Sequence, residues 1–340
     1  MSSKLLVAFI AGTLACLFVP TARCATLTES ETFRIDSSDA GIQLQLRNRH
    51  PARQSKFAAD RVVLFVHGAT FPIASAFDVD LPGGSWMNYV AEHGYDVYGV
   101  DVRGYGGSTR PKAMDGDPKA AAPIAVTRDA VNDVAAAVNY ILKRRGITQL
   151  NLIGWSWGTT TAATFAAENP ATVLRLVLYA PVWLPMRAPP YEGAYRTVTK
   201  ESTRATNTNG IPKDRVEEIS PSAWYDKWWA ATSVTDLGGA LRKPPVLRAP
   251  NGCMKDFNEF WAAGKPVYDP AAITASTLVV VGEWDATTPP AMAQALFPLL
   301  TGTHNKRLVI LSEGTHQMSL EKNRMRLIGE VQHFLGEPVN

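Results

Sequence analysis

Short apolar runs alternate along the chain with longer segments in which apolar residues recur every three or four positions. Such runs are typical of strands buried on both faces of a sheet, and the wider spacing is typical of amphipathic helices. The expected strands are residues 33–35, 42–46, 61–66, 96–100, 150–153, 173–180, 277–281 and 307–311. The expected helices are residues 86–93, 127–145, 159–167, a segment that begins at 290, and 318–334. The alternation predicts an α/β fold with a mostly parallel central sheet and helices on both faces.

Two parts of the chain depart from this alternation. The first two expected strands flank the polar turn Ser37–Gly41, which favours an antiparallel hairpin at the edge of the sheet. Between residues 182 and 270, prolines and tryptophans are frequent and no period is clear. This stretch is too long for an ordinary loop, so we expect an inserted cap over the functional site and call it the cap segment. Residues 25–181 and 271–340 would then form the core of the fold.

The first 24 residues have the pattern of a secretory signal. Lys4 supplies a positive charge, an almost unbroken apolar run extends from residue 5 to residue 19, and small residues follow. The run is shorter than the roughly 20 residues that a membrane-spanning helix needs. We therefore expect residues 1–24 to be removed near Cys24 and Ala25, and the mature protein to be secreted or periplasmic without a stable membrane span.

Composition and charge argue against several classes of protein. Apolar residues make up 46% of the 340 residues, which is ample for a sizeable core. The formal net charge is only +3, with both signs mixed along the chain, which does not indicate nucleic-acid binding. Three cysteines are too few for a disulfide framework, and no cysteine–histidine cluster suggests a metal. We therefore expect no metal and no nucleic-acid partner.

The strongest chemical signal is the stretch Gly154–Gly158, which reads Gly-Trp-Ser-Trp-Gly between an expected strand and an expected helix. It fits the G-x-S-x-G nucleophile elbow, in which a serine on a sharp strand-to-helix turn projects from the sheet. The two glycines remove side chains that would collide where the backbone doubles back. The N-terminus of the following helix presents free N–H groups to a developing oxyanion. We therefore expect Ser156 to be a nucleophile.

A serine nucleophile requires a histidine base, and the histidine requires a carboxylate that orients it. His316 is the best-placed of the six histidines, because it lies in a glycine-containing loop after the last expected strand. The carboxylate should come between the serine and the histidine in chain order, and Asp285 follows the penultimate strand there. Glu283 competes for this role, but its position directly after the strand favours a structural hydrogen bond. The predicted triad is Ser156, His316 and Asp285.

The oxyanion that forms when a serine attacks a carbonyl requires two N–H donors, usually from the backbone. We expect one from Trp157, the residue after the nucleophile, and the other from the turn after residues 61–66. In that turn we favour Ala69 over Thr70, with Gly68 allowing the backbone to approach closely. We expect His67 to brace the turn rather than to act as a base.

Aromatic residues beside the elbow and in the cap segment suggest an apolar substrate pocket, because aromatic side chains often line such pockets. The residues expected to line it are Thr70, Trp155, Trp183 and Trp228. The alternative is that the tryptophans of the cap segment only pack that segment onto the core.

Taken together, these motifs resemble the α/β-hydrolase fold family from about residue 60 to residue 335. The resemblance is carried by His67–Gly68, Asp101–Ser108, the elbow at Ser156, Gly282–Asp285 and Gly314–His316, which occur in the family's order. It implies a serine hydrolase that uses neither metal nor cofactor, in which Asp101–Ser108 is a structural turn. Epoxide hydrolases and haloalkane dehalogenases of this fold carry aspartate in the elbow, and this chain carries serine.

The expected substrate is a carboxylic ester of moderate size with an apolar or aromatic part, cleaved through an acyl-enzyme. An amide, a lactone or a carbon–carbon bond could be cleaved by the same residues, and these alternatives remain open. A third alternative is an exported binding protein with a hydrolase fold that has no activity. The sequence makes no prediction about the oligomeric state.

Overall fold

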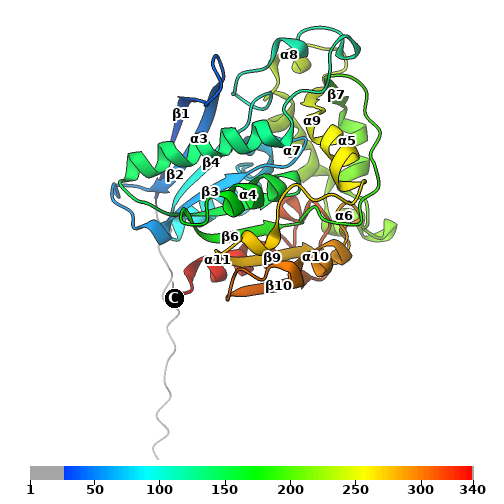
Figure 1. Ribbon diagram of the computed structural model, residues 1–340. Coiled ribbons are helices and arrows are strands. Elements are labelled where there is room, and N and C mark those ends of the chain that lie inside the picture. The colour runs from blue at the N-terminus through cyan, green and yellow to red at the C-terminus, as the bar shows by residue number, and fades with distance from the viewer. Residues whose placement is uncertain (1–26, 339–340) are drawn as a thin grey trace, which may run out of the picture.

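The computed structural model describes residues 27–338, and an eight-stranded sheet forms its centre (Figure 1). The strands are β1 (Thr28–Asp36), β2 (Gln43–Pro51), β3 (Val62–Val66), β4 (Asp96–Asp101), β5 (Leu150–Trp155), β6 (Val173–Tyr179), β9 (Ser276–Gly282) and β10 (Lys306–Leu311). Their order across the sheet is β1-β2-β4-β3-β5-β6-β9-β10. β2 pairs antiparallel with β1 and with β4, and all other neighbours are parallel. The predicted mostly parallel sheet and its antiparallel edge hairpin are therefore confirmed.

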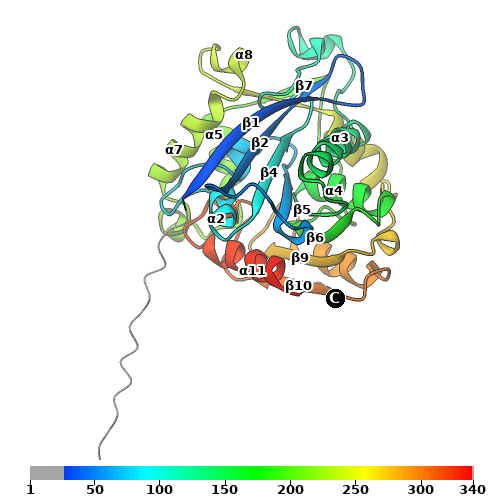
Figure 2. The ribbon, with the colours of Figure 1, turned by 90° about the vertical axis from the view of Figure 1, so that its left-hand side faces the viewer.

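Helices cover both faces of the sheet (Figure 2). Outside the cap segment they are α1 (Ile73–Ala76), α2 (Trp86–Glu92), α3 (Thr127–Arg145), α4 (Trp157–Glu168), α10 (Pro290–Leu296) and α11 (Met325–Gly336). α3, α4 and α10 share one apolar cluster with Val62, Leu64 and Val66 of β3. α2 and α11 share the other cluster with Val63 and Phe65. Successive side chains of a strand point to opposite faces, so an apolar run such as β3 fills two cores at once.

The predicted helix over residues 318–334 is wrong at its start. A single 3₁₀ turn, Met318–Leu320, comes first, and α11 begins only at Met325. Between them the Glu321 side chain is buried and accepts a hydrogen bond of 2.5 Å from the Thr315 hydroxyl. The next backbone N–H, that of Lys322, donates to the carbonyl of Ile219 instead of to a helical partner. These outside bonds replace the helical pattern that the apolar spacing suggested.

The cap segment contains more regular structure than its sequence suggested. Its elements are β7 (Tyr195–Val198), α5 (Lys200–Asn207), α6 (Val216–Ile219), α7 (Ser222–Ser233), α8 (Leu237–Ala240), β8 (Leu247–Pro250), α9 (Gly252–Asp256) and one π-helical turn (Phe257–Trp261). β7 and β8 pair antiparallel as a separate two-stranded sheet. The irregular sequence pattern of this segment thus contains several short helices and strands.

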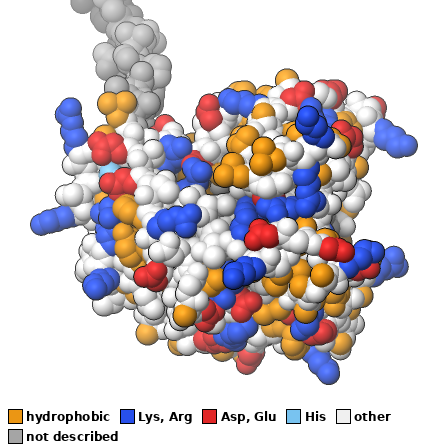
Figure 3. Space-filling model, turned by 90° about the horizontal axis from the view of Figure 1, so that it is seen from above, with side chains coloured by type: hydrophobic (Ala, Val, Ile, Leu, Met, Phe, Trp, Pro, Cys, Tyr) orange, Lys and Arg blue, Asp and Glu red, His pale blue; other side chains and the backbone are white. Residues whose placement is uncertain are grey.

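The surface of the described residues carries charges of both signs. Lys, Arg, Asp and Glu side chains are interspersed on the face seen from above (Figure 3). Among residues 27–338, no helix is both long enough and apolar enough to cross a bilayer. The predicted secretory signal, residues 1–24, lies outside the described residues.

Candidate active site

Ser156 joins β5 to α4 in a strained backbone conformation. Its φ is 56° and its ψ is −125°, which is rare for a residue with a side chain and is typical of functional turns. The turn requires glycine on both sides, because a Cβ on Gly154 would strike the backbone of Gly158, and one on Gly158 would strike Val66. The Ser156 N–H donates to the carbonyl of Tyr179 on β6 at 3.0 Å. The conformation is thus fixed by the sheet on both sides of the serine.

Asp285 and His316 meet at the carboxyl ends of β9 and β10. His316 Nδ1 lies 2.8 Å from Asp285 Oδ2, and both side chains are buried. The other carboxylate oxygen, Oδ1, accepts from the N–H groups of Thr287 and Thr288 at 2.9 and 2.7 Å. The Thr288 hydroxyl donates to Oδ2 at 2.9 Å. Since the carboxylate accepts at Nδ1, the hydrogen on that nitrogen points to Asp285 and Nε2 is left as a proton acceptor.

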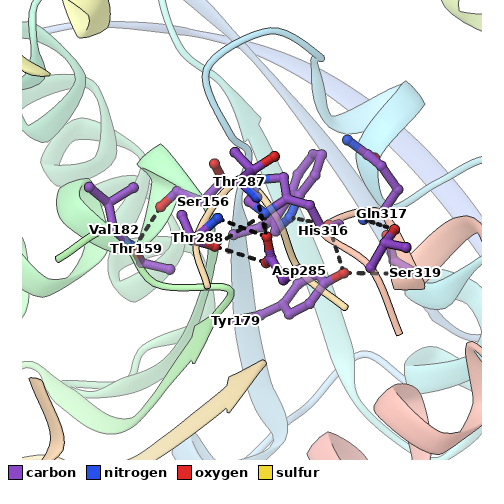
Figure 4. A network of polar contacts seen from close by, with 12 residues as sticks. Ser156, Thr159, Tyr179, Val182, Asp285, Thr287, Thr288, His316, Gln317 and Ser319 are labelled. Carbon is purple, nitrogen blue, oxygen red and sulfur yellow. Dashed lines mark hydrogen bonds and ion pairs between the residues drawn. The ribbon is translucent and has the colours of Figure 1, made fainter. Parts of the chain in front are cut away.

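The loop that carries His316 is anchored through its backbone (Figure 4). The carbonyl of His316 accepts two hydrogen bonds, from the Trp155 indole at 3.1 Å and from the Tyr179 hydroxyl at 3.0 Å. The Trp155 ring also lies against the imidazole, with 5.5 Å between the ring centroids. Two aromatic residues at the ends of β5 and β6 therefore set the position of a loop that follows β10.

Ser156 and His316 line one cavity of about 340 Å³ at the carboxyl ends of the strands. One part of the wall is apolar and comes from Phe71, Trp155, Val198, Met254 and Phe257. Another part carries uncharged polar groups from Thr70, Thr197, Ser202, Thr203, Thr206, Thr287 and Gln317. His316 is the only titratable residue among the described residues that line it. The Ser156 hydroxyl and the His316 ring both face this cavity, and no hydrogen bond joins them.

The turn after β3 places Ala69 on the wall of the same cavity. Gly68 leads into it, and its carbonyl oxygen lies 2.8 Å from Nδ1 of His67. The other ring nitrogen of His67 accepts from the N–H of Val102 at 3.2 Å, so Nδ1 carries the hydrogen and donates to Gly68. Burial lowers the pKa of His67, which keeps the ring neutral. Because a trans peptide points its C=O and N–H in opposite directions, this bond also orients the N–H of Ala69.

The second expected donor, the N–H of Trp157, begins α4 directly after Ser156. The first N–H groups of a helix have no partner within the helix. The Trp157 indole points away into the core, where it donates to the Thr127 hydroxyl at 2.9 Å. The tryptophan side chain thus packs in the core, and only its backbone lies beside the serine.

Two of the four expected pocket residues lie elsewhere. Thr70 and Trp155 line the cavity, but Trp183 packs against Trp261 and Tyr268. Trp228 is buried, with its indole donating to the carbonyl of Ser75 at 3.0 Å. Both tryptophans satisfy the packing alternative, because Trp183 packs against other aromatic rings of the cap segment and Trp228 bonds the cap segment to the core at Ser75.

Sequence reasoning missed the part that α5 plays in the cavity. Ser202, Thr203 and Thr206 line it, and their spacing of three and four residues is the helical signal that could have identified a polar wall. Thr288 was also missed, although it follows Asp285 by three residues in the same loop.

Comparison with known proteins places this geometry in context. Residues 61–322 match the family model described as alpha/beta hydrolase fold. Human gastric triacylglycerol lipase is 26% identical over 147 residues, which are 43% of this chain and 37% of that protein. Mouse lipase member K is 29% identical over 151 residues, 44% of this chain and 37% of that protein. The chain thus matches little more than a third of the length of these curated relatives.

Solved structures with the same fold cover nearly the whole chain. A serine hydrolase from the polyaromatic hydrocarbon-degrading bacterium Cycloclasticus zankles has a TM-score of 0.59 and 16% identity, covering 90% of this chain and 98% of its own. An esterase from Thermogutta terrifontis has a TM-score of 0.55 and 18% identity, covering 90% and 98%. The 2-hydroxy-6-oxo-6-phenylhexa-2,4-dienoate hydrolase of Rhodococcus sp. strain RHA1 has a TM-score of 0.59 and 16% identity, covering 91% and 99%. At these identities the likeness concerns the fold.

Proposed function

This chain belongs to the α/β-hydrolase fold family, and we propose that it is a serine hydrolase that cleaves carboxylic esters through an acyl-enzyme. The observation that supports this best is the contact of 2.8 Å between His316 Nδ1 and Asp285 Oδ2, beside the cavity that Ser156 faces. The order Ser156, Asp285, His316 along the chain is the order expected on this fold. A binding protein without activity would have no need for a strained serine facing an oriented histidine.

In the proposed mechanism, His316 Nε2 takes the proton of the Ser156 hydroxyl as the serine oxygen attacks the ester carbonyl. Asp285 holds the imidazole in its reactive tautomer and stabilises the imidazolium that forms. The N–H groups of Ala69 and Trp157 receive the negative charge on the tetrahedral oxygen. His316 then protonates the leaving alcohol, and the same ring activates the water that releases the acid.

The walls of the cavity support an uncharged substrate of moderate size. A volume of about 340 Å³ lies at the lower end of the range for small-molecule sites. The wall carries no lysine or arginine among the described residues, whereas a substrate that is itself a carboxylate would call for a cation there. The hydrolase from Rhodococcus is named for a dienoate, which is such an anion. We therefore favour a neutral ester with an apolar part over a carbon–carbon substrate of that kind.

We also propose that the protein acts outside the cytoplasm, on the strength of the signal-like pattern of residues 1–24. Mass determination of the N-terminus of protein secreted by the native host would test this, with a start near Ala25 expected. A first residue at Met1 would contradict it.

The test of the function is hydrolysis of chromogenic acyl esters of rising chain length by the wild-type protein and by Ser156→Ala. Loss of the nucleophile in such triads lowers turnover on the order of a million-fold, so the variant should be inactive. A fluorophosphonate should label the wild type at Ser156 and leave the variant unlabelled. Matched amides and a carbon–carbon substrate complete the panel. Activity that survives in Ser156→Ala would contradict the assignment of the nucleophile.

A further inference from the structure

Arg196, on β7 of the cap segment, reaches across to the turn that carries the expected oxyanion donor. Its Nη2 donates to the carbonyl of Ala69 at 2.6 Å and to the hydroxyl of Thr70 at 2.8 Å. Its Nη1 donates to the carbonyl of Pro250 at 2.8 Å and to Asn251 Oδ1 at 3.3 Å. One guanidinium therefore joins both strands of the cap segment's small sheet to the Ala69 turn of the core.

The carbonyl of Ala69 accepts a second hydrogen bond, from the hydroxyl of Tyr105 at 2.7 Å. This carbonyl belongs to the peptide that follows the N–H of Ala69. The preceding peptide is held by His67 through the carbonyl of Gly68. Each peptide is planar, so only the two backbone dihedral angles of Ala69 can vary between these two peptides. The hydrogen bonds that hold the two peptides therefore together determine where the N–H of Ala69 points. Arg196 supplies the part of this restraint that comes from the cap segment.

Among residues 27–338, no carboxylate forms a hydrogen bond or an ion pair with the guanidinium of Arg196. All four of its hydrogen bonds go to uncharged oxygens. Burial raises the pKa of the neighbouring Cys253 thiol and raises that of the Tyr105 hydroxyl well above its usual range, so both groups are neutral. The positive charge thus remains uncompensated beside the turn whose N–H would face the negative charge that develops on the substrate oxygen during acyl transfer.

We propose that Arg196 is a positioning residue that fixes the Ala69 turn from the cap segment and so prepares the oxyanion site for acyl transfer. The proposal rests on the proposed function, because the oxyanion forms only if Ser156 attacks a carbonyl. It makes the rate of catalysis depend on a residue that does not line the cavity, and it couples the seating of the cap segment to the chemical step.

The test compares Arg196→Ala with Arg204→Ala in ester hydrolysis. Arg204 also lies in the cap segment, but its guanidinium donates to Ser220 and Glu217, away from the Ala69 turn. Removing one oxyanion donor outright costs about a hundredfold to a thousandfold in kcat. Since Arg196 acts through Ala69, we expect its loss to lower kcat by about tenfold to a hundredfold and to change KM by less than about threefold.

Two further readouts separate positioning from a loss of folding. Guanidinium ion, added below denaturing concentrations, should raise the kcat of Arg196→Ala part of the way toward the wild-type value. It should not raise the kcat of the wild type. Arg196→Lys keeps a charge but has a single nitrogen, so it cannot bond the Ala69 turn and the carbonyl of Pro250 at the same time. Its kcat should therefore stay nearer to that of the alanine variant. Thermal melting of each variant establishes that it is folded.

The outcomes distinguish this inference from the proposed function. A wild-type protein that neither reacts with a fluorophosphonate nor hydrolyses any ester would overturn the proposed function. An active wild type whose Arg196→Ala variant has the kcat of Arg204→Ala would overturn only the role of Arg196. A wild-type kcat in Arg196→Lys would also overturn it, because charge alone would then suffice.

Discussion

At the scale of single residues, the candidate site depends on hydrogen bonds to groups that do not face the substrate. Asp285 receives two backbone N–H groups and the Thr288 hydroxyl in addition to His316. The order of Ser156, Asp285 and His316 along the chain, and the turn or loop that carries each of them, could be predicted from the sequence. The hydrogen bond from Thr288 to Asp285 could not be predicted, because a hydroxyl three residues away bonds to the carboxylate only in one loop conformation.

Asp285→Asn tests the orienting role of the carboxylate. An amide in this place can present its NH₂ to the ring and hold the imidazole in the wrong tautomer, so kcat should fall about ten-thousandfold while the fold is retained. The measurement is steady-state hydrolysis of the best ester, with circular dichroism to check the fold. Asp269→Asn, at an exposed turn, is the matched control and should keep wild-type activity. A loss in Asp285→Asn of less than tenfold would contradict the role.

Glu321 gives a prediction for pH. Burial raises its pKa to about 7 from an ordinary value of 4.5, against the hydrogen bonds from Thr315. The folded state therefore binds more protons than the unfolded state between these values, and stability falls as pH rises from about 4.5 to 7. Glu321→Gln should remove this loss, which is on the order of 3 kcal/mol, since each pKa unit corresponds to about 1.4 kcal/mol.

Denaturant titrations of wild type and Glu321→Gln at pH 5 and pH 8 measure this effect. The variant should gain stability relative to wild type as pH rises, and the exposed Glu29→Gln should not. An equal difference between wild type and Glu321→Gln at both pH values would show that Glu321 does not titrate in this range.

At the scale of elements, apolar runs predicted the central strands to within a few residues, because burial on both faces leaves little other pattern. The cap segment was harder to predict, although α7 places Tyr225, Trp228, Trp229 and Thr232 at helical spacing. Its prolines and short elements obscured that period, and aromatic rings suggested a pocket where the structure has packing. The positions of candidate site residues at the ends of strands were thus easier to predict than the roles of residues in the cap segment.

Trp183→Ala tests whether the tryptophan near the start of the cap segment holds that segment in place. Trp183 is buried against Trp261 and Tyr268, so its loss should cost roughly 3 to 5 kcal/mol of unfolding free energy. Because it does not line the cavity, the ratio of kcat/KM between short and long acyl esters should remain as in wild type below the melting transition. Phe260→Ala, at an exposed aromatic residue, is the control. A changed acyl preference in Trp183→Ala would instead show that Trp183 contributes to the substrate pocket.

At the scale of the whole molecule, the cavity is built from two sources. The sheet supplies Ser156, Asp285 and His316 at the ends of its strands, and the cap segment supplies much of the remaining wall. Under the proposed function, the reaction would take place on the core, and the cap segment would limit the size of the substrate. Ligands on such sheets bind at the carboxyl ends of the strands, and the predicted positions of Asp285 and His316 after strands agree with this rule.

Met254→Phe tests the contribution of the cap segment to size selection. Met254 lines the cavity, and a larger ring there should lower kcat/KM for long acyl esters by about tenfold while acetyl esters change little. The chain-length series with both proteins measures this. Met325→Phe, at an exposed methionine outside the cavity, should reproduce the wild-type profile. Equal losses for short and long esters in Met254→Phe would mean that the cap segment does not set the length limit.

β6 and β9 are direct neighbours in the sheet, and the cap segment lies within the single crossover between them. Parallel neighbours need such a crossover in any case, and here one connection carries both the covering wall and Arg196. For directed evolution under the proposed function, libraries confined to residues 195–206 and 254–257 would vary substrate range without touching the strands that hold Ser156, Asp285 and His316. Retaining arginine at position 196 in those libraries would be the condition for keeping the turnover rate while the specificity is redesigned.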